Sequence, residues 1–224
     1  IMIQGNNISK DYFIDNQKRL QVFNNINFNI ERNEKVGFLG LNGSGKSTIC
    51  KIISQSEPIS SGELKISSSI SWPIGIYNCL KESLTAKENI RFISIAYGID
   101  SKKISDQIEY YAELEGFMSN PIKTYSAGMR AKLAFFIAFS IEFDFYICDE
   151  ITSVGDVSFR KKAQEFFDTI VKDKGLILCS HNSENIKKNV DKVYVVYNGG
   201  LSEKLEVSDG LKFYEKIRLN KNEK

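Results

Sequence analysis

The stretch Gly40–Thr48 reads GLNGSGKST and fits the pattern G-x-x-x-x-G-K-[ST] of a phosphate-binding loop. Its glycines let backbone N–H groups point at phosphate oxygens, and the helix expected after it presents its positive end to the same anion. Lys46 supplies a positive charge for the β- and γ-phosphates, and the Ser47 hydroxyl suits Mg²⁺, a hard cation that prefers oxygen ligands. The residues expected to bind the nucleotide here are Gly40, Asn42, Gly43, Ser44, Gly45, Lys46, Ser47 and Thr48.

A second candidate site follows the apolar run 143–148, where Asp149 and Glu150 come in succession. Ligands of open α/β sheets bind at the carboxyl ends of the strands, so these two carboxylates are well placed for chemistry. We expect Asp149 to hold Mg²⁺, directly or through water, and Glu150 to polarise an attacking water in line with the γ-phosphate. A guanine-selecting N-K-x-D pattern is missing, because the nearest string, at 220–223, lacks the aspartate. This argues against a GTPase of the Ras type.

The elements that must position these residues follow from hydrophobic patterning. Strand and helix patterns alternate with short turns, which predicts an α/β domain around a largely parallel sheet. A strand at 36–39 leads into the phosphate-binding loop and a helix at 47–54 follows it. The other expected strands are an N-terminal antiparallel pair, 3–8 and 22–30, and the buried runs 143–148, 176–179 and 193–197.

A mostly helical segment separates the two halves of the expected core. Its helices are predicted at 85–98, 103–114 and 126–141, with Leu84-Thr85 supplying the first N-cap. The C-terminal end predicts a short helix at 212–217 that fades into a charged, solvated tail.

Composition excludes several functions. The net charge of +2 gives no reason to expect nucleic acid as a partner, and a single histidine, His181, rules out sites that need several His ligands. The four cysteines form no C-x-x-C pair, which predicts reduced, buried thiols rather than zinc binding. No apolar run is long enough to span a bilayer, and residues 1–5 do not suggest a secretion signal.

Taken in order, the motifs resemble those of the ATP-binding subunits of ABC transporters. The string YSAGMR at Tyr125–Arg130 is similar to the signature motif L-S-G-G-Q, with Ser126 and Gly128 as the matching residues. Ser153–Asp156 resembles the D-loop, with Asp156 as its aspartate. His181 follows an apolar run and resembles the switch histidine, which implies contact with the γ-phosphate and help in positioning the water and Glu150.

Two further positions are less specific. Tyr12 is similar to the aromatic residue that stacks on adenine in this family, and Phe13 and Phe23 compete with it for that role. The family usually carries a Mg²⁺-contacting glutamine between the phosphate-binding loop and the signature motif, but the stretch 72–82 contains none. Asn78 is the nearest chemical substitute, whereas the spacing places the position nearer Ile76, so this contact stays unassigned.

Several strings resemble the polysaccharide-export branch of the family, and most closely its capsular polysaccharide exporters in Gram-negative bacteria. These strings lie at 71–73, 83–92, 125–135 and 153–156. O-antigen and teichoic acid exporters are alternatives, as are an ABC ATPase that works without a permease and a P-loop kinase. Some O-antigen exporters add a carbohydrate-binding domain, for which 224 residues leave no room.

The resemblance implies a P-loop NTPase fold with a RecA-like core, N-terminal antiparallel strands and a helical subdomain. It implies one nucleotide-binding domain over 1–224, with the α/β core at 1–84 and 143–224 and the helical subdomain at 85–142. It implies ATP hydrolysis with Mg²⁺, carried by Glu150, His181 and Lys46 and coupled to export. The implied partners are a second copy, head to tail, and an integral membrane permease that holds the chain at the cytoplasmic face of the inner membrane.

Overall fold

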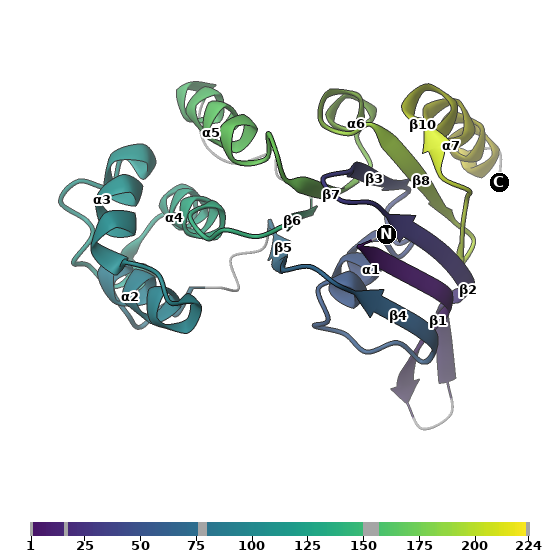
Figure 1. The fold of residues 1–224 in the computed structure, drawn as a ribbon, viewed down its shortest axis with the longest axis horizontal. Coiled ribbons are helices and arrows are strands. Elements are labelled where there is room, and N and C mark those ends of the chain that lie inside the picture. The colour runs from purple at the N-terminus through teal and green to yellow at the C-terminus, as the bar shows by residue number, and fades with distance from the viewer. Residues whose placement is uncertain (1, 16–17, 76–79, 150–156, 223–224) are drawn as a thin grey trace. The chain divides into compact units, whose positions relative to one another are not determined.

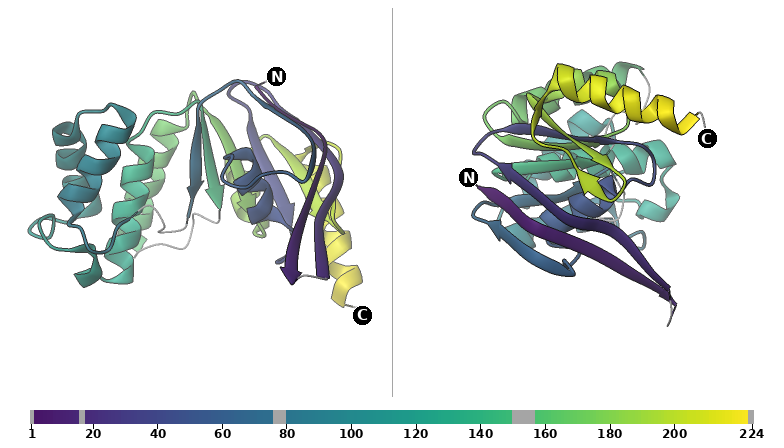
Figure 2. Two further views of the ribbon diagram at one scale, coloured as in Figure 1. Left: turned by 90° about the horizontal axis from the view of Figure 1, so that it is seen from below. Right: turned by 90° about the vertical axis from the view of Figure 1, so that its right-hand side faces the viewer.

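The structure is a computed structural model that describes residues 2–15, 18–75, 80–149 and 157–222. The chain forms two compact units (Figures 1 and 2). Unit 1 comprises Ile1–Pro73, Phe143–Glu150 and Asp173–Lys224, and unit 2 comprises Ile74–Glu142 and Ile151–Lys172.

Unit 1 begins with an antiparallel sheet. Strands β1 (Ile3–Asp15), β2 (Lys18–Ile30) and β4 (Ser61–Ile66) pair in the order β2-β1-β4. The expected N-terminal antiparallel pair is confirmed, and each strand extends well beyond its predicted range. Irregular register along the β1–β2 pair accompanies this length.

The second sheet of unit 1 is the expected parallel core. Its strands are β3 (Lys35–Gly40), β5 (Ile70–Ile74), β6 (Phe145–Asp149), β7 (Gly175–Ser180), β8 (Lys192–Tyr197), β9 (Gly200–Leu201) and β10 (Leu205–Glu206). They run in the order β10-β8-β3-β7-β6-β5, and β9 pairs with β8. Strand β3 is parallel to both β7 and β8, and β6 is parallel to β7. The carboxyl ends of these four strands therefore meet at one edge.

Helix α1 (Lys46–Ile53) lies between the two sheets, and α6 (Ser183–Asn189) and α7 (Val207–Asn222) cover the other face of the core sheet (Figure 1). Successive residues of β3 face opposite sides of the core sheet, so one strand contacts helices on both faces. Gly37 faces Ile186 of α6, whereas Phe38 belongs to the apolar core that α1 fills. That core joins Ile49, Ile52 and Ile53 of α1 to both sheets.

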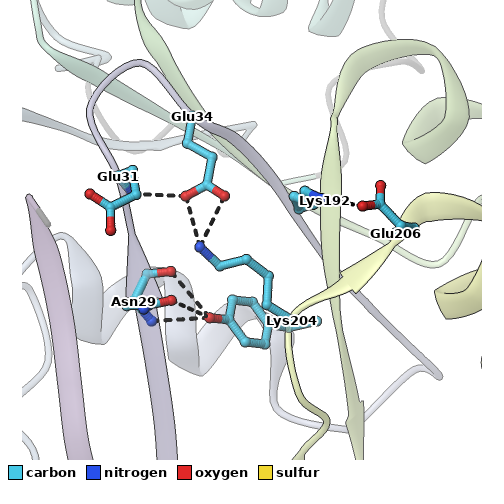
Figure 3. Close-up of polar contacts among 7 residues, drawn as sticks. Asn29, Glu31, Glu34, Lys192, Lys204 and Glu206 are labelled. Carbon is cyan, nitrogen blue, oxygen red and sulfur yellow. Dashed lines mark hydrogen bonds and ion pairs between the residues drawn. The ribbon is translucent and has the colours of Figure 1, made fainter.

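A polar network lies at the amino ends of β3 and β8, opposite the phosphate-binding loop (Figure 3). Lys204 donates to both carboxylate oxygens of Glu34 at 2.9 Å, and the same carboxylate accepts from the Glu31 N–H at 2.8 Å. Lys192 pairs with Glu206. The Tyr194 hydroxyl donates to the Asn29 carbonyl oxygen at 3.1 Å, which ties β8 to β2. Burial raises the pKa of Tyr194 to about 12.

Unit 2 is helical. It contains α2 (Ala86–Tyr97), α3 (Ser101–Ala112), the short 3₁₀ helix η2 (Ile122–Thr124), α4 (Ala127–Phe139) and α5 (Val157–Ile170). Thr85 caps α2 as predicted: its hydroxyl accepts from the Glu88 N–H, and the Glu88 carboxylate accepts from the Thr85 N–H in return. The core of the unit is aromatic, with Phe136 packed against Tyr111, Phe159 and Phe166.

Several elements differ from the sequence interpretation. Strands β4 and β5 and helices α5 and α6 are not among the predicted elements, and α7 is much longer than the predicted 212–217. The interpretation assigns 143–224 to the core, whereas α5 groups with the helical unit. The reason is packing, because Phe159 and Phe166 join the aromatic cluster on Phe136 and Lys162 pairs with Glu113.

Candidate functional site: the phosphate-binding loop and its sheet edge

The loop between β3 and α1 depends on glycine at two points. Gly45 has φ 107° and is the N-cap of α1, and a Cβ there would lie 2.7 Å from the ring of Phe23. A Cβ at Gly40 would lie 2.6 Å from the Ser44 Oγ and 2.7 Å from the Val196 carbonyl oxygen. The left-handed backbone of Gly45 and the close neighbours of both glycines leave no room for a side chain. Glycine at these two positions therefore allows the loop to curl tightly over the start of the helix.

Lys46 opens helix α1 and is buried. Its Nζ donates to the carbonyl oxygens of Gly40 at 2.8 Å and Leu41 at 2.9 Å, so the ammonium is held inside the curve of its own loop. Those acceptors are uncharged, and a phosphate would offer the same ammonium stronger, charge-assisted hydrogen bonds. Ser47 is exposed and Thr48 half-buried in the same first turn, where the positive end of the helix dipole lies.

Asp149 and His181 belong to the same sheet edge as the loop. Asp149 is the last residue of β6 and is aligned with Cys179 of β7, and Leu39 is aligned with Ser180. Gly40 and His181 each follow one residue later, so the loop, the carboxylate and the histidine all emerge at the carboxyl ends of adjacent parallel strands. His181 is exposed, and its carbonyl oxygen accepts from the Tyr214 hydroxyl at 3.3 Å.

Two buried thiols lie beneath the loop, and a third is buried nearby on β6. The sulfur atoms of Cys50 on α1 and Cys179 on β7 lie 2.7 Å apart, and the Cys179 thiol donates to the Lys46 carbonyl oxygen at 3.5 Å. Burial raises the pKa of the Cys50 and Cys148 thiols, and the nearby charge of Asp149 adds to the effect. These three cysteines are free and buried, which keeps them as packing groups rather than nucleophiles.

The donors near the loop fit Mg²⁺. Over the described ranges, no group of three His, Cys, Asp or Glu side chains comes together as a metal site. Mg²⁺ bound with a nucleotide takes most of its oxygen ligands from phosphates and water and needs only one or two protein side chains. The exposed Ser47 hydroxyl at the start of α1 and the half-buried Asp149 carboxylate at the end of β6 are suited to that role.

A cavity of about 570 Å³ opens beside the loop. It is lined by Leu20, Gln21, Val22, Leu41, Asn42, Gly43, Ser44, Val196, Tyr197, Asn198, Gly199, Ile217 and Asn220. Its volume is in the range of small-molecule sites. The sequence interpretation includes Asn42, Gly43 and Ser44 in the site, but it assigns no site residue to the β8–β9 turn or to the C-terminal helix. No local pattern identifies these, because only the tertiary fold brings them to the loop.

Tyr12 lies on β1 opposite Leu20 of β2 and does not line this cavity. Its ring is half-buried, with the Lys10 ammonium 4.7 Å from the ring centroid. Of the two competing aromatics, Phe23 is buried against the phosphate-binding loop and Phe13 is 79% exposed.

The signature-like segment belongs to unit 2. Ser126 is the N-cap of α4, its Oγ accepting from the Met129 N–H at 3.1 Å, and both Ser126 and Gly128 are exposed. Tyr125 takes the place of the family's leucine and is buried, donating to the Phe117 carbonyl oxygen at 2.7 Å. This anchor leaves the first turn of α4 open at the surface. A Cβ at Gly128 would have only the Ser126 Oγ near it, at 3.8 Å.

Several residues discussed from the sequence lie outside the described residues: Ile76, Asn78, Cys79, Glu150 and the D-loop-like segment Ser153–Asp156. Within the described part of the chain, no helix combines the length and apolar character needed to cross a bilayer.

Comparison with known proteins agrees with the geometry. A family model described as "ABC transporter" matches residues 23–153. The chain is 37% identical to the ATP-binding protein BexA of Haemophilus influenzae, over 97% of this chain and 100% of that protein. It is 36% identical to the capsule polysaccharide export ATP-binding protein CtrD of Neisseria meningitidis serogroup B, over 96% and 100%.

Among solved structures, the ATP-binding cassette MJ0796, a dimer in a post-hydrolysis state with ADP and Pi, matches with a TM-score of 0.78. It is 21% identical and covers 92% of this chain and 99% of its own, so this likeness concerns the fold. With the phosphate-binding loop, the Asp149 carboxylate and His181 at one sheet edge, and with relatives matched over nearly their full length, this chain belongs to the ABC transporter family and carries its ATP-binding domain.

Proposed function

We propose that the chain is the ATP-binding and ATP-hydrolysing subunit of a polysaccharide exporter, with capsular polysaccharide as the cargo. The observation that carries the ATPase assignment is the convergence of three groups at one sheet edge: the loop around Lys46, the Asp149 carboxylate and His181. The cargo assignment is supported by the relatives, one of which is named for capsule polysaccharide export and is matched over its full length.

In this proposal the chain's own groups hold and orient ATP. The backbone N–H groups of Gly43–Thr48 and the Lys46 ammonium bind the phosphates. Ser47 and Asp149 hold Mg²⁺, which when bound neutralises developing charge on the phosphates. Glu150 accepts a proton from the attacking water, and His181 orients that water against the γ-phosphate. Tyr12 remains the residue proposed to stack on adenine.

A second copy completes the site. Each chain carries one phosphate-binding loop. The exposed Ser126 and Gly128 at the start of α4 form a second helix end that suits an anion, and a second chain would bring the phosphate that this helix end binds. We propose a head-to-tail homodimer in which Ser126, Gly128 and Asp156 act on the ATP held by the partner copy. ATP binding closes the dimer and hydrolysis opens it.

The proposed membrane partner is an integral permease, which binds the ATPase at the cytoplasmic face of the inner membrane and moves the glycan. The helical unit and the segment 72–84 are the proposed contact. We keep the proposed division into an α/β core at 1–84 and 143–224 and a helical subdomain at 85–142. Helix α5 is the exception, because it packs with the helical unit.

Glu150→Gln is the decisive variant. It keeps the size and polarity of the side chain but removes the base, so ATP binding is expected to persist while hydrolysis falls by at least about 10²-fold. Phosphate release and nucleotide titration on the full chain measure the two effects. Turnover close to wild type would contradict the assignment.

The permease partner is tested by copurification with this chain. The cargo is tested in a strain that lacks its own capsule export ATPase, where this chain should restore the capsule. If it restored only teichoic acid or O-antigen export, the cargo assignment would change to that glycan.

A further inference from the structure

His181 lies in the turn between β7 and α6, and side-chain hydrogen bonds fix the residues on either side of it. Ser180 is buried, and its hydroxyl accepts from the Asn182 N–H at 3.0 Å, which bridges the turn across His181. The Asn182 side chain caps α6 by accepting from the Glu184 N–H at 2.9 Å. The turn is therefore held to the sheet at one end and to a helix at the other.

A third contact reaches the same turn from helix α7. The Tyr214 hydroxyl donates to the His181 carbonyl oxygen at 3.3 Å, across 33 positions of the sequence. Tyr214 is only 3% exposed, and burial raises the pKa of its hydroxyl, which keeps it protonated as a donor at neutral pH. This contact acts on the backbone of His181 itself, whereas the contacts of Ser180 and Asn182 act on its neighbours.

The position of Tyr214 is set by the packing of α7 on the core sheet. Gly210 lies one helical turn before Tyr214 and on the same side of the helix. A Cβ at Gly210 would lie 2.0 Å from the Val193 side chain, so glycine lets the helix backbone approach β8 closely. The Phe213 ring meets the Tyr197 ring edge to face at 5.1 Å and adds a second contact to β8. These two contacts hold the Tyr214 side of α7 against the sheet.

We propose that Tyr214 is a positioning residue for ATP hydrolysis: its hydroxyl holds the backbone of His181 so that the imidazole points at the γ-phosphate. This inference rests on the proposed function, in which His181 orients the attacking water, and it gives the C-terminal helix a part in turnover. The Cα–Cβ direction of His181 follows the backbone of the turn, and hydrolysis responds steeply to small errors in the position of such a group. Nucleotide binding does not depend on this contact, because the loop around Lys46 holds the phosphates.

Tyr214→Phe removes the hydroxyl and keeps the ring that packs beside the sheet, so the fold should persist. We expect kcat for ATP to fall about 3- to 10-fold, the effect of one lost hydrogen bond, while the dissociation constant for ATP stays within about 2-fold of wild type. Tyr194→Phe is the matched control, because it also removes a buried tyrosine hydroxyl, but one that bonds Asn29. Its kcat per folded molecule should equal that of wild type. An equal fall in kcat in both variants would overturn the inference.

The His181→Ala background separates positioning from general damage. If Tyr214 acts through His181, Tyr214→Phe should lower kcat in the wild-type chain and have no further effect once the imidazole is removed. The same fold loss in both backgrounds would overturn the inference. Wild-type kcat for His181→Ala alone would instead contradict the proposed role of His181 in hydrolysis.

A direct readout exists because His181 is the single histidine of this sequence. Its imidazole C–H protons give one pair of resonances in the NMR spectrum of the untagged chain, and His181→Ala identifies them by their loss. Tyr214→Phe should shift or broaden these resonances, whereas Tyr194→Phe should leave them unchanged. An imidazole signal that is identical in wild type and Tyr214→Phe would overturn the inference. This measurement needs no turnover, so it decides the inference even if the His181→Ala variants hydrolyse ATP too slowly to be compared.

Discussion

The Lys46 ammonium donates hydrogen bonds to carbonyl oxygens of its own loop, so its substitution is the most direct single-residue test of nucleotide binding by that loop. Lys46→Ala removes the buried positive charge while leaving the glycines that shape the loop. We expect the dissociation constant for ATP to rise about 10- to 100-fold, the effect of losing charged hydrogen bonds. Isothermal titration calorimetry measures it.

Lys51→Ala is the control for this change, because Lys51 is an exposed lysine in the last turn of the same helix α1. Its substitution alters the net charge equally and should leave affinity unchanged. Equal loss in both variants would mean that overall charge, and not the loop, governs nucleotide binding.

The residues of the loop could be predicted individually because the motif is local. Gly40, Gly45 and Lys46 are each required by a neighbour within the strand–loop–helix unit or by the bound anion. Ile217 and Asn220 could not be predicted, because their part in the cavity depends on the seat of α7 on β8. From the sequence, Ile217 ends the predicted short helix and Asn220 lies in the charged, solvated tail that follows it.

At the scale of elements, the ties between the antiparallel sheet and the core sheet determine where the loop is held. Tyr194 joins β8 to β2 through Asn29, whose N–H also donates to the tyrosine hydroxyl at 3.0 Å. Tyr194→Phe removes the hydroxyl and leaves those backbone groups unpaired. The expected loss of unfolding free energy is about 1–3 kcal/mol at neutral pH, measured by urea unfolding.

The same residue predicts a pH dependence. Burial raises its folded pKa to about 12 from 10, so the folded state holds the proton more tightly than the unfolded chain. The contribution is fully present below pH 10 and is lost as the pH rises toward 12. Its loss lowers the unfolding free energy by about 2–3 kcal/mol at most. Wild type should lose stability between pH 10 and 11.5 more steeply than Tyr194→Phe, and parallel profiles would contradict this.

The parallel core was predictable because its strands are short, buried apolar runs. Strand β5 was missed although it carries a usable signal: Pro73 within an apolar segment is typical of an edge strand, and β5 lies at the edge of its sheet. The grouping of α5 with the helical unit was not predictable, because it depends on ring contacts such as that between Phe159 and Phe136. Those contacts join segments far apart in the sequence.

For the whole molecule, the signature segment allows assembly to be tested separately from folding. In the Glu150→Gln background we expect ATP to produce a stable dimer, detected by size-exclusion chromatography with light scattering. Ser126→Asp keeps an equally good N-cap for α4 but places a carboxylate where the partner's phosphate is proposed to lie. Nucleotide binding and melting temperature should persist while the ATP-induced dimer is lost.

Gly128→Ala is the companion variant. The structure leaves space for the added methyl group, and alanine favours a helix by up to about 1 kcal/mol over glycine. Stability should therefore be kept or gained. Weakened dimerisation would then come from the partner copy, whereas an ATP-induced dimer as stable as that of the parent in both variants would contradict the head-to-tail arrangement.

The thiols under the phosphate-binding loop have a practical consequence. Cys50 of α1 and Cys179 of β7 are fully buried in the core that α1 fills, and burial raises the pKa of Cys50, so an alkylating reagent modifies them only when the packing of α1 on the sheet opens. Their alkylation rate therefore reports how often the structure around the phosphate-binding loop opens. A nucleotide that holds the loop closed should lower this alkylation rate. Because the thiols are native, the measurement needs no engineered cysteine.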